Sequence, residues 1–306
     1  MTVHTDTPDL STQSAEDIAA AYRSLPVEGA GKCLARKIVF GGVRHSGLMR
    51  LHEKVRSWTR EPFMTIVLFH RVTDAIPADA LTVGLKWFRE FCDLMKRSYH
   101  VVPLDEIYKT LNEGGKPTAR TIAITFDDCY HDNLRAAELL AEHGLPATFF
   151  VPSGFVGRVG PMPWDMHLPP MNNLTWEDLR RIVGLGHGIG SHTVTHPDLS
   201  QLTVEQTREE LLHSKKTLED NLGQRVRYFA YPFGGTGNFR AEQLPLVYEA
   251  GYEGCVSAEQ GFVEMNMKGQ VLPRVPMPPY QSMTQLEMRL TRCLEWVRAF
   301  KRATSG

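Results

Sequence analysis

The chain has 306 residues, with 34 Lys and Arg against 35 Asp and Glu, so its formal net charge is −1. Apolar residues make up 42% and charged residues 23%, which is ordinary for a globular protein. The near-neutral total argues against a nucleic-acid binder, because such proteins carry a basic surface. The sequence has no run of about 18 apolar residues, so we expect no membrane-spanning helix. The first residues show no basic stretch followed by an apolar one, and the five cysteines are scattered without a CxxC pair, so we expect no secretory signal and a reducing, cytoplasmic location.

The first 60 residues carry a charge asymmetry that the total conceals. Residues 1–31 hold five acidic side chains and one basic one, whereas residues 32–60 hold eight basic side chains and one acidic one. The polar, acidic part is typical of a flexible terminus. The basic part mixes its charges with apolar residues and predicts an amphipathic helical extension. We expect it either to contact an anionic membrane surface peripherally or to pack across the main domain or at a dimer contact, with the oligomeric state left open.

From residue 61 to about residue 300, short β-branched and aromatic runs alternate with helical patterns, which predicts one domain. Alternation of this kind implies parallel strands joined by right-handed crossovers. About seven such units favour a distorted (β/α) barrel over a doubly wound sheet. The predicted elements, in chain order, are a strand at 64–70, a helix at 82–97, strands at 99–104 and 121–126, a helix at 132–144 closed by Gly144, a strand at 147–152, a Gly-, Pro- and Met-rich loop at 153–174, a helix capped by Thr175, a strand at 188–193, a helix from the capping box of Thr203 and Gln206 to about 221, a strand at 227–233, a helix near 241–250, strands at 253–258 and 271–277, and a helix at 283–300.

Polar residues gather directly after three of these strands. Asp127 and Asp128 follow the strand at 121–126, and His192 and His196 follow the strand at 188–193. In parallel α/β folds the carboxyl ends of strands meet at one mouth, where reactive side chains collect. Two histidines and a carboxylate suit an open zinc-type site. The third cluster, YFAYPFGG at 228–235, can present backbone N–H groups to an anion.

Each cluster by itself has an ordinary structural explanation. Paired acids are often solvated surface charges, and two histidines four residues apart often lie only on one helix face. The three clusters in this order, each after a predicted strand, indicate a reaction site. The sequence contains none of the GxxxxGK[ST], GxSxG or HExxH patterns of other chemistries.

The three motifs together resemble those of the NodB-homology polysaccharide deacetylases, metal-dependent amidases that remove N-acetyl groups from amino sugars. TFDDCYHDN at 125–133 resembles the family's TFDDG, SHTVTH at 191–196 its H-[ST]-x-x-H, and 228–235 its Tyr-Pro-aromatic-Gly form. The stretch 174–202 is similar to the family over its whole length. The resemblance covers roughly residues 64–280.

This resemblance implies a metal site and a base. Asp128, His192 and His196 are the implied ligands of a divalent metal, with Zn²⁺ expected and Co²⁺, Ni²⁺ or Fe²⁺ as alternatives. Asp127 is the implied general base, which takes a proton from a water whose pKa the metal lowers toward neutrality.

The resemblance also implies a substrate-binding turn. Tyr231, Pro232 and Phe233 form it, and the Phe233 N–H is the expected partner of the metal in holding the tetrahedral oxyanion. In the 153–174 loop, Trp164 is the expected contact for a sugar ring.

The sequence departs from the family pattern at three places. No Leu-x-His motif, from which many members take the general acid, occurs after residue 213. We therefore expect His70 to be the acid, a layout that resembles the poly-N-acetylglucosamine deacetylase branch; the alternative is a histidine that is merely hydrogen-bonded at a strand end. Arg274 is the candidate for the missing arginine that orients the base, or else forms a plain surface ion pair. Cys129 replaces the family's glycine, either as a small residue or as a metal-binding or oxidation-sensitive thiol.

The sequence thus predicts a metal-dependent N-deacetylase that acts on an N-acetylated carbohydrate in cell-surface or exopolysaccharide synthesis. Polymer, oligosaccharide, lipid-linked sugar and nucleotide sugar all stay open as substrates. The alternatives are a related amidase that acts on a small non-sugar amide and an inactive carbohydrate-binding module.

Overall fold

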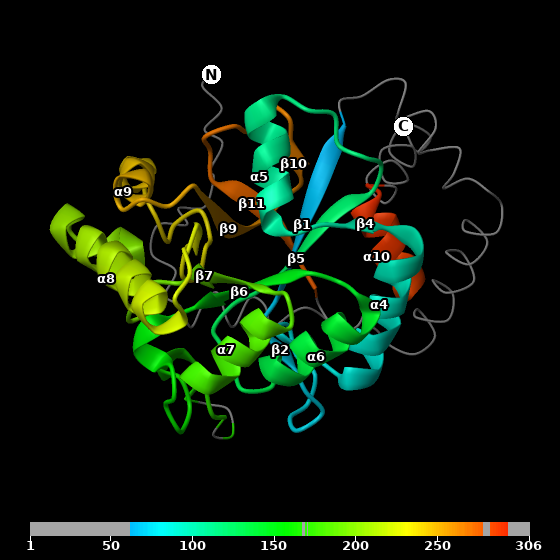
Figure 1. Ribbon diagram of the computed structural model, residues 1–306, viewed down its shortest axis with the longest axis horizontal. Coiled ribbons are helices and arrows are strands. Elements are labelled where there is room, and N and C mark those ends of the chain that lie inside the picture. Colours follow the sequence, from blue (N-terminus) through cyan, green and yellow to red (C-terminus); the bar gives the residue numbers. More distant parts are fainter. Residues whose placement is uncertain (1–61, 167–168, 170, 278–281, 293–306) are drawn as a thin grey trace, which may run out of the picture.

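The computed structural model describes residues 62–166, 169, 171–277 and 282–292 (Figure 1). The acidic segment 1–31, the basic extension 32–60 and the last part of the helix predicted at 283–300 lie outside the described residues.

Within the described residues, seven parallel strands close into a barrel (Figure 1). The strands follow one another in the order β1, β11, β9, β8, β7, β6, β5, and β5 pairs back onto β1 with Thr65 opposite Ile122. This arrangement confirms the predicted (β/α) barrel. The bounds of the strands are β1 Phe63–Phe69, β5 Thr121–Phe126, β6 Ala147–Val151, β7 Gly188–Ser191, β8 Tyr228–Ala230, β9 Gly254–Gln260 and β11 Leu272–Pro276.

Helices pack around the barrel because each of them has one apolar face. In α4, for example, Phe88, Phe91 and Met95 are fully buried against the strands. Two short strands extend the barrel sheet, β4 His100–Val101 beside β5 and β10 Val263–Glu264 beside β1, and β2 Arg71–Val72 pairs with β3 Thr82–Val83 in a separate two-stranded sheet. The helices are α4 Leu85–Ser98, α5 Leu104–Glu113, α6 Asn133–His143, α7 Trp176–Gly184, α8 Val204–Leu222, α9 Leu244–Glu249 and α10 Met283–Leu290.

The predicted helix ends are confirmed where the sequence carries a cap. Thr175 and Thr203 begin α7 and α8 with complete capping boxes, and Gly144 ends α6 in the left-handed conformation at φ 71°.

The strand predicted at 99–104 is shorter than expected, and the sequence did not predict the helix that follows it. Only His100–Val101 forms a strand there, and α5 begins at Leu104, directly after Pro103. Apolar residues before and after Pro103 form one run in the sequence, so the change from strand to helix has no periodicity to mark it. The helix predicted at 82–97 also begins later, at Leu85, because Thr82–Val83 pairs with Arg71–Val72 as β3.

Helix α5 closes the amino-terminal end of the barrel. The Tyr108 ring stacks on that of Tyr228, the first residue of β8, with centroids 4.7 Å apart. Its hydroxyl donates to the Cys255 carbonyl at the start of β9, at 2.7 Å. The carboxyl ends of the strands are therefore the open mouth.

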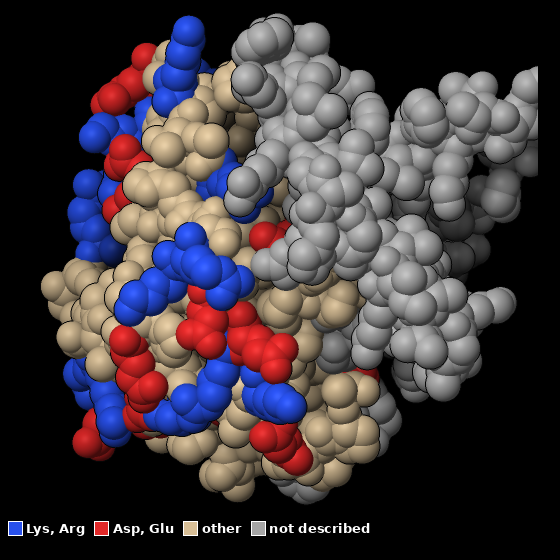
Figure 2. Space-filling model, turned by 90° about the vertical axis from the view of Figure 1, so that its right-hand side faces the viewer, with Lys and Arg blue, Asp and Glu red and all other residues tan. Residues whose placement is uncertain are grey.

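The charges of the described surface are mixed. On the face in Figure 2, small groups of basic and acidic side chains lie interspersed, without a field of one sign. Among the described residues, no helix is both long and apolar enough to cross a membrane.

Candidate active site

The residues at the mouth continue the backbone ladder of the barrel. The Asp127 N–H donates to the Phe69 carbonyl of β1 at 3.0 Å, and the His192 N–H donates to the Val151 carbonyl of β6, also at 3.0 Å. The side chains that follow β5 and β7 are therefore held on rigid strand ends and meet at the same mouth.

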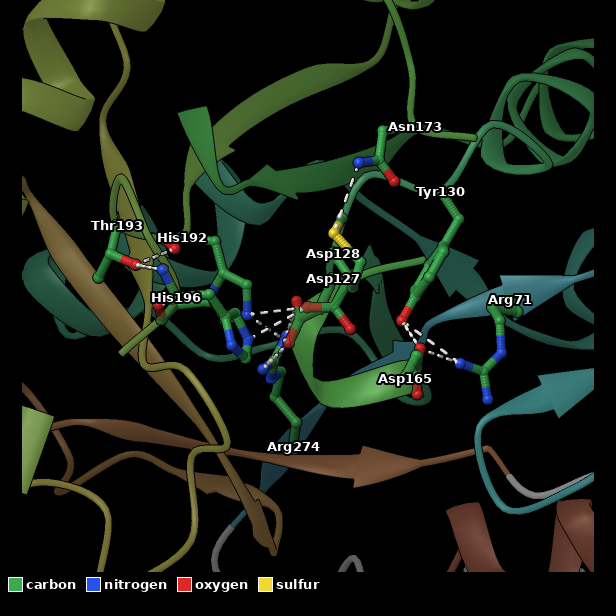
Figure 3. Close-up of polar contacts among 12 residues, drawn as sticks. Arg71, Asp127, Asp128, Tyr130, Asp165, Asn173, His192, Thr193, His196 and Arg274 are labelled. Atoms are coloured by element: carbon green, nitrogen blue, oxygen red, sulfur yellow. Dashed lines mark hydrogen bonds and ion pairs between the residues drawn. The ribbon is translucent and has the colours of Figure 1, made fainter. Parts of the chain in front are cut away.

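Asp128, His192 and His196 form a compact buried cluster there (Figure 3). One ligand-type atom of each lies within 4.8 Å of the others. The Asp128 Oδ1 atom is 3.5 Å from His192 Nε2 and 3.2 Å from His196 Nε2. No other group of ligand-type side chains with this spacing occurs among the residues that the structure describes.

The hydrogen bonds of the cluster fit a divalent cation. His192 donates from Nδ1 to the Ala230 carbonyl at 2.7 Å, which leaves the Nε2 lone pair facing Asp128. The buried Asp128 Oδ1 has no hydrogen-bond partner in the described part of the chain. A buried carboxylate oxygen in that state requires a cation to offset its desolvation. One carboxylate and two imidazoles are the donors of open zinc-type sites.

The Asp128 carboxyl is ionised in this setting. Burial raises its pKa, but the adjacent His192 and His196 imidazoles outweigh that effect and bring the pKa well below the ordinary value of 3.8. The carboxyl is therefore in the form that binds a metal.

Asp127 is held by a buried arginine. Arg274 on β11 donates from Nη1 and Nη2 to the two oxygens of Asp127 at 2.8 and 2.6 Å, a fork-to-fork pair (Figure 3). Arg274 is itself fixed by the Ser257 carbonyl at 2.7 Å and by Thr125 Oγ1 at 3.2 Å. The arginine is 0% exposed, so this ion pair lies in the interior and not at the surface.

The pair also sets the charge of Asp127. Burial raises the pKa of this carboxyl, and the Arg274 guanidinium more than offsets that, so the pKa falls below 3.8. Asp127 is therefore a carboxylate able to accept a proton, with its orientation fixed on both oxygens.

His70 lies at the same mouth, directly after β1. Its carbonyl accepts a hydrogen bond from Asn133 Nδ2 at 2.7 Å. Burial lowers the pKa of His70 below 6.5, although the nearby carboxylates of Asp128 and Asp127 raise it. The half-buried imidazole is therefore largely neutral at pH 7, and acting as an acid requires it to receive a proton first.

The turn after β8 brings its residues to the site in different ways. The Tyr231 ring points into the core and stacks on Phe239 with centroids 4.2 Å apart, so only its backbone is near the mouth. Pro232 leads into Phe233, which has a left-handed φ of 59° and lays its ring 4.8 Å from that of His196. Gly234 follows at φ 61°, where an added Cβ would lie 2.4 Å from the Ala258 nitrogen.

Trp164 stands over the metal-ligand cluster. Its ring stacks on the His196 imidazole with centroids 3.8 Å apart and planes 27° apart. The 153–174 loop therefore reaches the mouth, and its tryptophan forms one wall of the site.

Cys129 is not part of the cluster. Its side chain is 1% exposed, and burial raises the pKa of the thiol to about 12. Its φ of 63° is the conformation that a glycine adopts most easily, which accounts for the glycine in TFDDG at this position.

The sequence patterns did not predict two groups of residues that support the site. Arg71, Tyr130 and Asp165 form a buried polar network that joins the 153–174 loop to β2 and to the segment after β5. Glu210 on α8 accepts from the backbone N–H groups of Val194 and of the residue after it. The only sequence signal was the position of Arg71 next to His70, because burial and pairing of distant charges are not periodic features.

The fold and the site define a (β/α)-barrel protein with a buried carboxylate–histidine cluster that could hold a metal ion at the carboxyl ends of its strands. A family model described as polysaccharide deacetylase matches residues 114–254. Residues 114–254 thus match the polysaccharide deacetylase domain of the NodB-homology type, whose members are hydrolases that act on amide bonds. His70 and Arg274 lie outside the matched residues.

Individual proteins agree with this assignment. YxkH of Bacillus subtilis (strain 168) is 26% identical over 224 residues, which cover 72% of this chain and 73% of that protein. A chitooligosaccharide deacetylase of Bradyrhizobium sp. (strain ANU 289) is 30% identical over 129 residues, 40% of this chain and half of that protein. The solved structure of the Streptococcus pyogenes deacetylase PplD in complex with acetate has the same fold, with a TM-score of 0.65 and 24% identity over 74% of this chain and 98% of that one.

Proposed function

We propose that this chain hydrolyses N-acetyl groups from an amino-sugar-containing glycan with the help of a divalent metal. The observation that carries the proposal is the buried cluster of Asp128, His192 and His196 beside the ion pair of Asp127 and Arg274. The name of the Bradyrhizobium relative, a chitooligosaccharide deacetylase, supports an N-acetylated sugar as substrate.

Asp128, His192 and His196 would hold the metal. A divalent ion in such a site acts as a Lewis acid and lowers the pKa of water toward neutrality. Zn²⁺ suits this mixed nitrogen and oxygen set best, and Co²⁺, Ni²⁺ or Fe²⁺ also suit it.

Asp127 and His70 would move the protons. The Asp127 carboxylate accepts a proton from the attacking water, and Arg274 keeps it in one orientation through both oxygens. The amine can leave only after it gains a proton, and His70 is the group that would donate it. Since burial lowers the pKa of His70, its proton must come from the reaction itself, passed on after Asp127 has accepted it.

The turn and the loop would bind the substrate. The Phe233 N–H, in the turn that Tyr231 and Pro232 lead into, would donate to the developing oxyanion. Trp164 offers an apolar ring next to His196, on which the face of a sugar can stack.

The cellular setting is part of the proposal. We infer a cytoplasmic enzyme of cell-surface or exopolysaccharide synthesis, in which the basic residues 32–60 either pack across the main domain or at a dimer contact, or contact a membrane surface peripherally. In the membrane case, full-length protein should sediment with anionic liposomes, and a variant that lacks residues 1–60 should not. Equal sedimentation of the two proteins would end the membrane idea.

Acetate release is the test of the function. Protein loaded with Zn²⁺ should release acetate from N-acetylglucosamine oligomers and should not open hydantoin-like cyclic amides. Asp127→Asn should lower kcat at least about 10²-fold, since general-base catalysis contributes that much. The matched control is Asp220→Asn, an exposed aspartate on α8, which should leave kcat unchanged. Unchanged activity in Asp127→Asn would contradict the mechanism, and glycan binding without acetate release would favour a binding module.

A further inference from the structure

Arg71 is a fully buried charge outside the proposed reacting groups. It directly follows His70, is 1% exposed, and has donors fixed in three directions. Nε donates to Thr82 Oγ1 at 2.8 Å, Nη1 to Asp165 Oδ2 at 2.6 Å, and Nη2 to Asp79 Oδ2 at 3.1 Å. Because these hydrogen bonds are directional, Arg71 restrains the position of the backbone segments that carry Thr82, Asp165 and Asp79.

Asp165 is the partner that belongs to the 153–174 loop. It is buried and receives a second hydrogen bond from the Tyr130 hydroxyl, whose ring also lies 5.2 Å from the Arg71 guanidinium (Figure 3). The Tyr130 hydroxyl is the donor in this contact, because a carboxylate oxygen can only accept. The two donors to Asp165 are therefore Arg71, which follows His70, and Tyr130, which lies two residues after Asp128.

The residue before Asp165 is Trp164. Both lie in the single 3₁₀ turn Pro163–Asp165, so the position of one fixes the position of the other. Outside that turn, the Trp164 ring packs against the rings of His196 and Phe155, with ring centroids 3.8 and 5.2 Å away. Neither contact is a directional hydrogen bond. Just before the turn, Asn173 Nδ2 donates to Met162 Sδ at 3.4 Å, and within the turn the directional side-chain restraint comes from the two donors to Asp165.

We propose that Arg71, Asp165 and Tyr130 form a loop clamp that positions Trp164 over the metal-ligand cluster. The three are positioning residues, because their side chains hydrogen-bond to one another and act on the site through Trp164. The inference rests on the proposed function only in taking the cluster as the place where the sugar binds.

Asp79 provides a matched control for the clamp. It also pairs with Arg71, but it lies in the segment before β3, is 37% exposed at its side chain, and does not touch the loop. If the role of Asp165 were only to neutralise Arg71, then Asp79→Asn and Asp165→Asn would act alike. If Asp165 positions the loop, only its own substitution moves Trp164.

The test reads Trp164 directly, without substrate. The difference in fluorescence between a protein and its Trp164→Phe counterpart isolates this one of the five tryptophans. In Asp165→Asn, we expect acrylamide quenching of that component to rise about twofold, because the ring loses its stacked, shielded position. In Asp79→Asn, acrylamide should quench the Trp164 component to the same extent as in the wild type. On N-acetylglucosamine oligomers, Asp165→Asn should raise KM about tenfold with a smaller change in kcat.

Unchanged Trp164 quenching in a folded Asp165→Asn protein overturns the clamp, and so does an equal rise in Asp79→Asn. If Asp165→Asn does not fold, Tyr130→Phe removes one donor without changing charge. It should raise quenching in the same direction, and no rise there also overturns the clamp. A wild type that releases no acetate from any N-acetylated sugar defeats the proposed function instead, while the quenching result still decides the clamp.

Discussion

At the residue scale, the most constrained contact is that between Asp127 and Arg274. The two side chains are 3% and 0% exposed, and they meet through two short hydrogen bonds. Leaving one member of such a pair unpartnered in the interior costs about 3–5 kcal/mol. The arginine therefore stabilises the barrel and orients the proposed base at the same time.

Arg274→Ala should separate these two roles. We expect a loss of about 3–5 kcal/mol in the free energy of unfolding, measured by urea denaturation, and a fall in kcat of about 10²-fold. Added guanidinium should restore part of kcat by occupying the vacated position next to Asp127. The exposed Arg225, replaced by Ala, serves as the control and should change neither quantity. Full activity in Arg274→Ala would show that the base needs no orientation.

Asp132 carries a second prediction, on stability and pH. Its Oδ2 accepts from the Val72 N–H, while its Oδ1 is buried without a partner among the described residues. Burial raises the pKa of Asp132 from 3.8 to about 6, so the folded protein holds this proton more tightly than the unfolded chain. Its contribution to stability is therefore present below about pH 4 and is lost as the pH rises to about 6.

Asp132→Asn should remove that loss, because an amide keeps an acceptor for Val72 and cannot ionise. Between pH 4 and pH 7 we expect the variant to gain at most about 3 kcal/mol relative to the wild type. Urea unfolding at the two pH values measures it, with the exposed Asp220→Asn as the reference. A constant difference between variant and wild type across this range would show that Asp132 titrates normally.

At the element scale, the loop after β7 depends on α8. Thr193 and His196 have left-handed φ values of 66° and 55°, an uncommon conformation for residues with a side chain. Glu210 on α8 offsets this strain by accepting from the Val194 and Thr195 N–H groups at 2.7 and 3.0 Å. The helix thus holds the metal-ligand loop in the shape that brings the two imidazoles together.

Glu210→Ala should weaken metal binding without removing a ligand. We expect the Kd for Zn²⁺, measured by competition with a chelating dye, to rise about tenfold, the lower end of what supporting partners contribute. Glu209→Ala, its exposed neighbour on the same helix, should bind Zn²⁺ like the wild type. Equal Zn²⁺ affinities of the two variants would mean that the loop after β7 keeps its shape without the hydrogen bonds to Glu210.

Helix α5 should affect stability but not catalysis, since it covers the amino-terminal end of the barrel, opposite the candidate active site. Tyr108→Phe removes the hydrogen bond to the Cys255 carbonyl and should cost about 1–2 kcal/mol in urea unfolding. Its kcat should equal that of the wild type. A changed kcat would mean that the two ends of the barrel are coupled.

At the scale of the whole molecule, metal binding and folding should be linked. The ligands come from β5 and β7, which the barrel brings together, so only the folded chain offers the complete site. Zn²⁺ at about 100 times its Kd should therefore add about 2.7 kcal/mol of stability. Chelator-treated protein should melt at a lower temperature than protein with Zn²⁺, and His196→Ala should lose that difference. An identical melting temperature with and without Zn²⁺, Co²⁺, Ni²⁺ and Fe²⁺ would contradict a metal site here.

The sequence by itself determined the alternation of strands and helices, the capped helix ends and the motifs that follow β5, β7 and β8. These features depend on neighbours a few residues apart, through periodicity, capping and turn chemistry. Only the tertiary structure decided that β5 closes onto β1, that Arg274 pairs with Asp127 across 147 residues, that Tyr231 faces the core, and that Arg71 is buried against Asp165. Those outcomes depend on strand pairing and side-chain direction in the closed barrel, which bring together residues that have no local relation in the chain.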